Sequence, residues 1–248
     1  MHSRPDTSGA LFLGAFSGWN DGSGAAVWAV RHLAKLWNAE DFAEVEPDLF
    51  YDFATWRPQV KVVNGTLRRV TWPTNRISAA KAMVRSAPEG ELIERDIILG
   101  VFEEPQLHWP TFISELIELC TTCDVREVVL LGSLLGQVPH TAPVRTTGVV
   151  TSPLFSRRMS VLGIEPATYE GDTGVLAAFQ DGVKRVGLPS ISLWAIAPHY
   201  IAASPNLPVA AALLDTFKHL YGATLDISDV RVAARRFLEK VSDLVGHD

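Results

Sequence analysis

The chain has 248 residues, of which 47% are hydrophobic and 20% charged, and its formal net charge is -6. This composition supports a sizeable buried core and excludes extensive disorder. Proteins that bind nucleic acid usually carry a basic face. Because no cluster of lysine and arginine in this chain exceeds a pair, we expect no nucleic-acid partner.

Two observations indicate a cytoplasmic protein with no membrane span. The chain contains only two cysteines, too few for a disulfide framework, and the apolar run at 10–16 is too short for a span and is followed by no cleavage pattern. Residues 188–214 lack charged side chains and have the length of a span. Prolines break any continuous helix there, and they stand at Pro189, Pro198, Pro205 and Pro208.

The first part of the chain predicts a strand, a glycine-rich turn and a helix. Residues 11–16 are apolar, and residues 25–37 place apolar side chains at helical spacing. A second strand is predicted at 45–53. Between the β-like runs 60–63 and 66–71, the dipeptide Asn64-Gly65 is a strong hairpin signal, because both residues tolerate positive φ. We therefore expect an inserted β-hairpin.

The rest of the chain alternates strands with helices. Strands are expected at 96–102, 127–131, 148–152 and 190–197, helices at 111–123, 153–162, 174–186, 206–221 and 228–245, and a loop at 132–147. The strand at 127–131 is almost entirely apolar, as in a parallel sheet covered on both faces. The pattern predicts one α/β domain over 1–248, a three-layer sandwich with a mostly parallel sheet. The helix at 228–245 is a candidate appendage to it.

Ligands of open α/β sheets bind beyond the carboxyl ends of the strands, and this rule selects four loops. The first contains Gly18, Asn20, Asp21 and Gly22. A glycine-rich turn that leads into a helix offers backbone N–H groups to an anion. The loop lacks the third glycine of a dinucleotide fingerprint and the Gly-Lys-Ser/Thr of a phosphate loop. A tight turn with helix capping is the alternative interpretation.

Three further loops add polar side chains at the same relative position. Each is also open to a structural interpretation, because a lone loop histidine is more often a hydrogen-bonding partner than a catalyst, and Asp and Thr are ordinary helix caps. Together the loops predict one ligand-binding cleft in which Asp21, His140, Glu170 and His199 are the catalytic candidates. The residues that these loops contribute are Gly132, Ser133, His140, Glu170, Asp172, Thr173, His199 and Tyr200.

The sequence lacks the motifs of several common catalytic and metal-binding sites. No Gly-x-Ser-x-Gly nucleophile elbow occurs. Cys120 and Cys123 have the C-x-x-C spacing but close a predicted helix, where the dipole does not favour a thiolate, so a structural role is expected. No second cysteine pair is present to complete a zinc site. We expect no metal and no cofactor.

The tryptophans point to self-association. Trp19, Trp56, Trp72 and Trp109 fall in or beside predicted loops, several next to arginine or proline, and such rings are typical interface anchors. The alternative is that they cover the sheet edges of a monomer. We expect a homo-oligomer, with a trimer as the first guess. The hairpin around Asn64-Gly65 is the candidate arm, since a two-stranded ribbon is marginal alone.

Five segments together resemble the proteasome assembly chaperone 2 family, and more closely its actinobacterial branch. The resemblance runs from about residue 11 to residue 214. Its most specific piece is the pair of runs Ser192-Leu193-Trp194-Ala195 and Pro198-His199-Tyr200. The first of these runs belongs to a longer segment, residues 188–195. The other segments are residues 18–25, residues 132–141 and residues 170–174.

The resemblance implies a three-layer α/β fold similar to nucleoside phosphorylases and peptidyl hydrolases. It also implies a protein partner, because eukaryotic members of the family are chaperones of proteasome ring assembly. Related archaeal chaperones dock through a hydrophobic-Tyr-X tail, whereas this sequence ends in Val245-Gly246-His247-Asp248. An ATP-grasp enzyme, a label given to some bacterial members, would need a lysine and paired carboxylates that the sequence does not arrange.

Two hypotheses follow. The first is an oligomeric interaction or assembly-chaperone-like scaffold with a partner related to proteasome assembly. The second is a phosphorylase- or hydrolase-like enzyme, or a small-anion binder, that uses the glycine- and histidine-lined cleft. Fold similarity alone does not choose between them. We prefer the first on the resemblance, and whether the chain is an enzyme stays open at this point.

Overall fold

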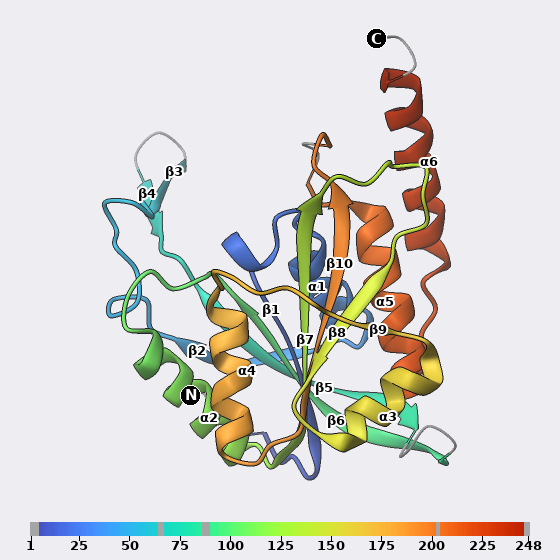
Figure 1. Cartoon of the computed structure of the whole chain (residues 1–248). Helices are drawn as coiled ribbons and strands as arrows, with labels where there is room; N and C mark the ends of the chain where they lie inside the picture. Colours follow the sequence, from blue (N-terminus) through green and yellow to red (C-terminus); the bar gives the residue numbers. More distant parts are fainter. Residues whose placement is uncertain (1–4, 64–66, 86–89, 202–203, 246–248) are drawn as a thin grey trace.

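The computed structural model describes residues 5–63, 67–85, 90–201 and 204–245. Within these residues the chain forms an eight-stranded sheet in the order β2-β5-β6-β1-β7-β10-β8-β9 and a separate two-stranded sheet of β3 and β4 (Figure 1). The predicted α/β architecture with a mostly parallel sheet and an inserted hairpin is confirmed.

Four parallel strands form the centre of the large sheet. They are β1 (Ala10–Phe16), β6 (Leu92–Phe102), β7 (Val125–Gly136) and β10 (Ser190–Pro198). Because they run in the same direction, the loops that follow them all leave from one edge of the sheet, and we call this the carboxyl edge.

The flanking strands are shorter or antiparallel. On one side β5 (Asn75–Arg85) pairs antiparallel with β6, and β2 (Glu40–Val45) pairs antiparallel with β5 and forms the end of the sheet. On the other side β8 (Thr146–Val150) pairs antiparallel with β10, and the short β9 (Glu165–Pro166) follows it.

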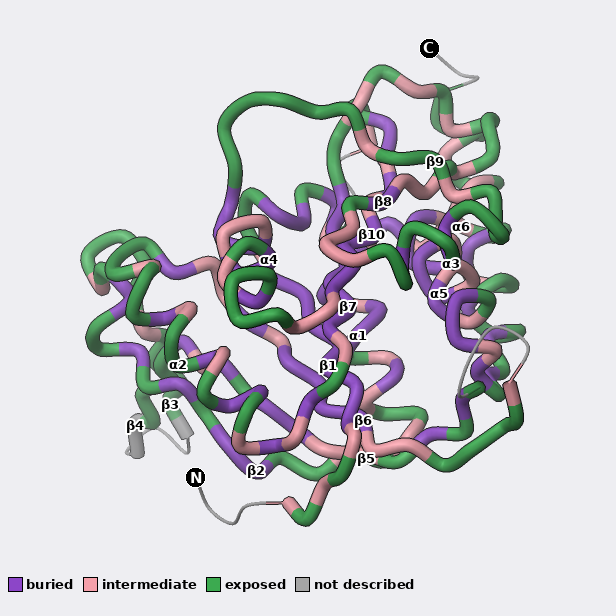
Figure 2. Tube along the Cα trace, turned by 60° about the horizontal axis from the view of Figure 1, so that its bottom comes forward, coloured by how far each residue is buried: buried purple, intermediate pink, exposed green. Residues whose placement is uncertain are grey.

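Helices cover both faces of the sheet. One hydrophobic cluster joins it to α1 (Ala25–Leu36), α3 (Pro153–Leu162) and α5 (Leu207–Tyr221). A second cluster on the other face joins it to α2 (Trp109–Thr122) and α4 (Val175–Arg185). The last helix, α6 (Ser228–Val245), packs on α5. Figure 2 shows the buried strands enclosed between more exposed elements.

The alternation of side chains along β1 explains why this strand is apolar throughout. Leu11 and Leu13 belong to the cluster under α1 and α5, whereas Phe12 and Phe16 belong to the cluster under α2 and α4. All four are fully buried. A strand covered on both faces has no solvent-facing position, so every residue must be apolar or small.

The hairpin is present with the expected flanks. β3 (Gln59–Val63) pairs antiparallel with β4 (Leu67–Thr71), and Val60 lies opposite Val70. The predicted Asn64-Gly65 turn lies outside the described residues. No helix in the described part of the chain has both the length and the apolarity that crossing a membrane requires.

The predicted strand at 45–53 is wrong. The strand in this region is β2, which ends at Val45. The Pro47 carbonyl accepts hydrogen bonds from the N–H groups of Phe50 and Tyr51 at 3.0 and 3.1 Å, and the chain turns there. Proline has no N–H to give to a ladder, so it ends the strand despite the apolar alternation that follows.

Two further differences concern neighbouring strands. Residues 132–136 belong to β7 and not to a loop, and Gly132 pairs with Trp194 of β10. A Cβ at Gly132 would lie 2.4 Å from the Trp194 ring, so the glycine makes room for the indole within the sheet. The strand β5 was not predicted, because its alanines and lysine carry little strand propensity.

Candidate functional site

The carboxyl edge gathers most of the predicted site residues, and the first group centres on Asp21. This buried carboxylate accepts hydrogen bonds from the N–H groups of Ala26 and Val27, at 3.0 and 2.9 Å, in the first turn of α1. Ser133 on β7 donates its hydroxyl proton to the same carboxylate. The Ser23 hydroxyl donates to the Ser133 oxygen at 2.7 Å. Asp21 therefore caps α1 and ties the first loop to β7.

Burial raises the pKa of Asp21, and the hydrogen bonds from Ser133 and from the backbone of Val27, Ala26 and Ala25 counteract that rise. Every strong donor around the carboxylate comes from the chain itself. The N-terminus of α1, where an anionic ligand would bind, is thus occupied by the chain's own carboxylate. The helix-capping interpretation of this loop is supported, with Asp21 as the acceptor and Gly24 as the N-cap residue.

The second group closes the N-terminus of α4 in the same way. Glu104, two residues after β6, accepts from the N–H of Val175 at 3.0 Å and from the side-chain amide of Asn20 at 2.8 Å. The Asn20 carbonyl accepts from the N–H of Leu176 at 3.2 Å. A Cβ at Gly174, the N-cap residue of α4, would lie 2.2 Å from this Asn20 oxygen. Glycine is needed there for the close approach.

The third group joins loops around β7 and β10 to α6. The Tyr200 oxygen lies 2.7 Å from the backbone nitrogen of His140 and 2.8 Å from its Nδ1. The Nε2 atom of His140 lies 3.1 Å from the Ser242 hydroxyl on α6. The ring of His199 packs edge-on against Tyr200 and lies 3.2 Å from the Gly136 carbonyl. This group fastens α6 to the carboxyl edge.

The remaining predicted residues have structural or surface positions. Gly18 adopts φ +71 at the start of a short 3-10 helix (Gly18–Asn20), and the N–H of Gly22 donates to the Ser133 carbonyl at 3.0 Å. Glu170, Asp172 and Thr173 are exposed. The capping role considered for Asp172 and Thr173 is wrong, because Gly174 is the N-cap of α4 and Glu104 supplies the carboxylate.

Asp21 and His140 line different cavities. Asp21 lies at a cavity of about 350 Å³ together with Trp28, Arg31 and Glu103. His140 lines a smaller cavity of about 140 Å³ with Val144 of the following loop and with residues of β10, α5 and α6. The two cavities share no lining residue. A single cleft around all four catalytic candidates stays a prediction.

A family model described as the PAC2 family matches residues 15–245. The chain belongs to the PAC2 family. It is 36% identical to a PAC2 family protein from Streptomyces avermitilis, with 95% of each chain covered and a TM-score of 0.85. It is 32% identical to the proteasome-assembly chaperone homologue Rv2125 of Mycobacterium tuberculosis, with 96% of each chain covered and a TM-score of 0.83.

A more distant structure shows the same PAC2 fold. PbaB of Pyrococcus furiosus, described as an archaeal proteasome activator, is 18% identical, with a TM-score of 0.72 and coverage of 98% of this chain and 96% of that one. Among curated proteins, none matches this sequence. The predicted resemblance to the proteasome assembly chaperone 2 family is confirmed as PAC2 membership.

Glu104 is the residue that sequence reasoning missed at this edge of the PAC2 fold. It follows the buried strand β6 directly after Glu103, so the rule that selected the four loops also points to it. Glu103 accepts a hydrogen bond from the Ser17 hydroxyl. In the described part of the chain, no group of three or more His, Cys, Asp and Glu side chains is arranged to hold a metal ion.

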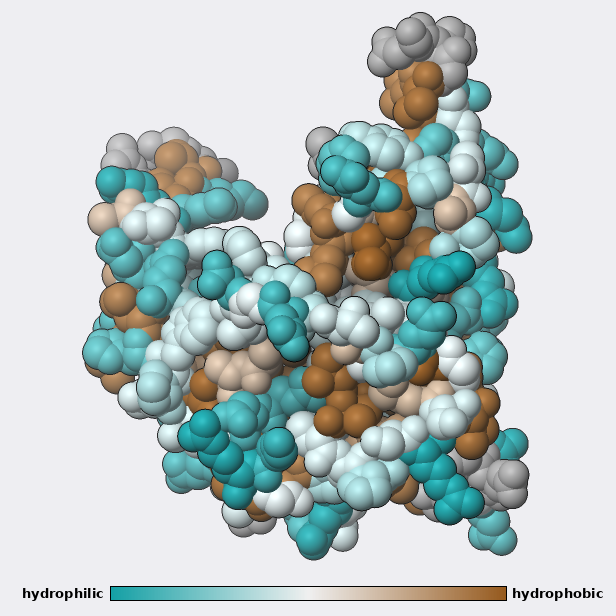
Figure 3. Space-filling view, in the orientation of Figure 1, coloured by the Kyte–Doolittle hydropathy of each residue, from teal (hydrophilic) through white to brown (hydrophobic). Residues whose placement is uncertain are grey.

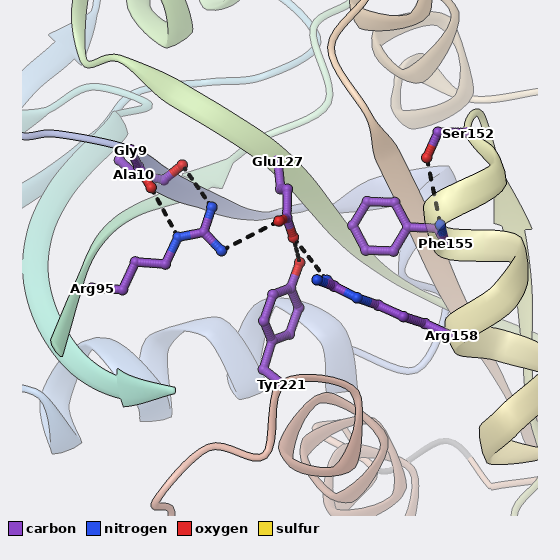
Figure 4. Close-up of polar contacts among 8 residues, drawn as sticks. All are labelled: Gly9, Ala10, Arg95, Glu127, Ser152, Phe155, Arg158 and Tyr221. Carbon is purple, nitrogen blue, oxygen red and sulfur yellow. Dashed lines mark hydrogen bonds and ion pairs between the residues drawn. The ribbon is translucent and has the colours of Figure 1, made fainter. Parts of the chain in front are cut away.

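A second missed group lies at the opposite, amino edge of the sheet (Figure 4). Glu127 on β7 accepts hydrogen bonds from Arg158 of α3 at 2.9 Å and from the Tyr221 hydroxyl of α5 at 2.8 Å, and it pairs with Arg95 of β6 at 3.5 Å. The Arg158 guanidinium also lies 5.3 Å from the centre of the Tyr221 ring. This cluster binds the sheet to two helices and has a structural role.

Proposed function

We propose that the chain is an oligomeric protein-interaction scaffold of the proteasome-assembly type, and that its carboxyl edge is a docking face. One observation carries the proposal. The N-termini of α1, α4 and α5 at this edge are filled by the chain's own side chains, while apolar side chains around them are left exposed. Both features favour a protein partner over a small anionic ligand.

Self-capping weakens the case for a small anionic ligand. α1 is capped by Asp21, α4 by Glu104 and Asn20, and α5 by the Asn206 side chain, which accepts from the N–H of Val209 at 3.2 Å. A phosphate or carboxylate ligand would have to displace the buried carboxylate of Asp21 and the half-buried carboxylate of Glu104 to reach the N–H groups of α1 and α4. Like charges would also repel it there.

The exposed apolar side chains suit a protein partner. Trp19 is 63% exposed, Leu135 50% and Tyr200 45%, and they come from three different loops or strand ends of the carboxyl edge. Leu135 packs against Gly22, which places it beside the first loop. Figure 3 shows apolar residues at the ends of β7 and β10 and a hollowed surface between these ends and the hairpin. Exposed apolar patches of this kind mark interaction sites.

The descriptions of similar proteins suggest what kind of partner the docking face binds. Two of the structures that this chain resembles are described as a proteasome-assembly chaperone homologue and a proteasome activator. We extend this description to the present chain as a proposal, with a proteasome subunit as the partner and the cytoplasm as the location.

Self-association is part of the same proposal, with a trimer as the expected size. Of the four loop tryptophans, Trp19, Trp56 and Trp72 are exposed. Trp109 is half-buried, and its ring N–H donates to the Pro105 carbonyl at 2.6 Å. We therefore assign this ring a structural role within the chain. The three exposed rings are available as interface anchors.

The experiment is a binding measurement with purified proteasome α-type subunits from the organism that encodes the chain. We expect co-sedimentation with the wild type and at least about tenfold weaker binding by a Trp19→Ser, Leu135→Ser variant, because hot-spot side chains dominate such interfaces. Leu162→Ser, an exposed apolar residue at the end of α3, is the matched control and should bind like the wild type. Equal binding by all three proteins would contradict the proposal.

The enzyme hypothesis keeps one supporting observation. The cavity beside Asp21 has a volume within the range of small-molecule sites, about 350 Å³, and Arg31 and Glu103 line it. Calorimetry with phosphate and ATP tests this alternative. Micromolar affinity of the wild type, abolished by Arg31→Ala, would favour the enzyme over the scaffold.

A further inference from the structure

An apolar groove lies along α6 beside the start of α5. Leu207, Val232, Ala233 and Phe237 supply its apolar lining, and its volume is about 610 Å³. Val232 is exposed and Phe237 is half-buried. We call this feature the α6 groove.

Cations flank the α6 groove. Arg236 and Lys240 line it one helical turn apart, on the same side of α6, and Asp229 is the acidic residue of the lining. Both cations are exposed. The groove is therefore apolar at its floor and positively charged along its wall, although the chain as a whole carries a net charge of -6.

The apolar stripe of α6 continues past its contact with the domain. Val230 and Ala234 are buried against the body of the protein. Phe237, Val241 and Leu244 follow at the same alternation of three and four residues, so they lie on the same side of the helix. Leu244 is 73% exposed. Figure 1 shows the end of α6 extending beyond the other elements, where this stripe has no cover.

The side of the molecule at β2 carries acidic side chains and an exposed leucine, which complement the cations and the apolar floor of the α6 groove. Glu44 on the terminal strand β2 and Glu46 and Asp48 in the turn after it are exposed, and Leu49 is 59% exposed beside them. We call these four residues the acidic flank. Figures 1 and 2 both show β2 on the far side of the sheet from α6.

The hairpin rises from the same side as the acidic flank. Val60, Val62 and Val70 lie on one face of the β3–β4 ribbon, because Val60 pairs with Val70 and Val62 stands two residues along. All three are exposed. The base of the ribbon is fixed by an edge-on contact between Phe53 and Trp72, with ring centres 4.8 Å apart. A two-stranded ribbon with a bare apolar face is marginal until it packs on something.

We infer that the α6 groove of one molecule receives the acidic flank of a second copy, with Leu49 seated between Arg236 and Lys240. In the same contact the valine face of the hairpin covers the apolar stripe at the end of α6. The hairpin and β2 lie on the same side of the molecule in both views (Figures 1 and 2), so a copy that presents its acidic flank to a neighbour also brings its hairpin to that neighbour. The inference rests on the proposed self-association and names the two surfaces that produce it.

The geometry makes this contact head-to-tail. The acidic flank lies at the β2 end of the sheet and α6 lies beyond the opposite half, so one chain does not bring them together. The two surfaces differ, so each molecule offers one of each to its neighbours, and a rotation that closes gives a ring. The expected trimer is one ring of this kind.

Charge-reversal variants and sedimentation at micromolar concentration test the inference. The groove variant is Arg236→Glu with Lys240→Glu, and the flank variant is Glu46→Lys with Asp48→Lys. Each places like charges across the contact, so each should weaken association at least about tenfold and move the mass toward the 27.1 kDa monomer. Lys184→Glu on the exposed face of α4 is the control and should keep the wild-type mass.

Mixing identifies the head-to-tail arrangement. In an equimolar mixture the normal flank of the groove variant meets the normal groove of the flank variant. The reversed flank of the flank variant meets the reversed groove of the groove variant, so opposite charges face each other at both contacts and the mixture should associate again. A chain that carries both sets of changes should associate again. A monomeric wild type, or variants that keep the wild-type mass, would overturn the inference. Variants that keep the wild-type mass and still bind proteasome subunits would overturn it while leaving the proposed function in place.

Discussion

Ser133, in the middle of the sheet, donates its hydroxyl proton to the carboxylate of Asp21, which caps the helix on the next segment of the chain. In an open α/β sheet this is the position where a ligand would meet the N-terminus of a helix. Here the chain supplies the anion itself. The contact converts a potential binding site into a structural joint between the first loop and β7.

Replacing Ser133 by alanine should destabilise the protein. The side chain is fully buried, and its loss removes one of the donors to the buried Asp21 carboxylate and leaves the Ser23 hydroxyl without its acceptor. Leaving such groups unsatisfied costs about 1–3 kcal/mol in the free energy of unfolding. Urea denaturation measures it. Ser114→Ala, which removes an exposed hydroxyl that bonds within α2, is the control and should change stability by less than about 0.5 kcal/mol.

Replacing Asp21 by asparagine should change the pH dependence of stability. Burial raises the pKa of Asp21 in the folded protein above its value in the unfolded chain, about 3.9. The folded state then binds this proton more tightly than the unfolded chain does. The resulting contribution to the free energy of unfolding is full below about pH 4 and is lost as pH rises through the folded pKa.

Asparagine does not titrate, so the free energy of unfolding of the wild type minus that of Asp21→Asn should fall as pH rises above about 4 and then level off. Urea denaturation of both proteins between about pH 4.5 and 7.5 checks this. A difference that stays constant, or that grows with pH, would show that hydrogen bonding to the carboxylate outweighs its burial.

Replacing Glu104 by alanine should open the N-terminus of α4 to small anions. The Glu104 carboxylate accepts the N–H of Val175 and of Trp19, both at 3.0 Å, and losing a cap costs about 0.5–2 kcal/mol. Formate has the right charge and size to replace it, so formate should raise the Tm of the variant more than chloride does at the same ionic strength. The wild type should respond equally to both salts. An equal response of the variant would show that no anion site has been opened.

Replacing Glu127 by alanine should be among the most destabilising single changes. It leaves Arg95 and Arg158 buried without their shared carboxylate, and breaking a buried ion pair costs about 3–5 kcal/mol. The control is Glu94→Ala, which removes an exposed partner of Lys81 and should cost less than about 1 kcal/mol. Similar losses in the two variants, measured by urea denaturation, would show that the buried cluster contributes no more than a surface pair.

The sequence predicts the fold well where one interaction dominates. The central strands are apolar because both faces are covered, and α3 and α6 begin and end at the predicted residues. Prediction failed where two signals compete. The alternation at 45–53 favours a strand, and Pro47 turns the chain instead. At Gly132 the residue type suggests a loop, and the Trp194 ring on the neighbouring strand explains the glycine.

The sequence indicated that several candidate residues follow or end buried strands, but it did not indicate which of them pair. The carboxyl-edge rule found Asp21, Ser133 and His140, since each follows or ends a buried strand. It could not show that Asp21 caps α1 through Ser133, or that His140 reaches Ser242 on α6. These contacts join residues 112 and 102 positions apart, and only the folded chain brings them together. The contact of α6 with the carboxyl edge, through Ser242, is therefore not readable from the sequence alone.

Amide hydrogen exchange with and without proteasome α-type subunits tests most directly whether the carboxyl edge is a docking face. The two components are mixed at concentrations where they co-sediment, and exchange is followed by mass spectrometry along the whole chain. We expect protection of peptides that cover residues 18–24, 134–140 and 198–201, with phosphate or ATP producing no such protection. Unchanged exchange at these residues, or protection there by phosphate or ATP alone, would contradict it.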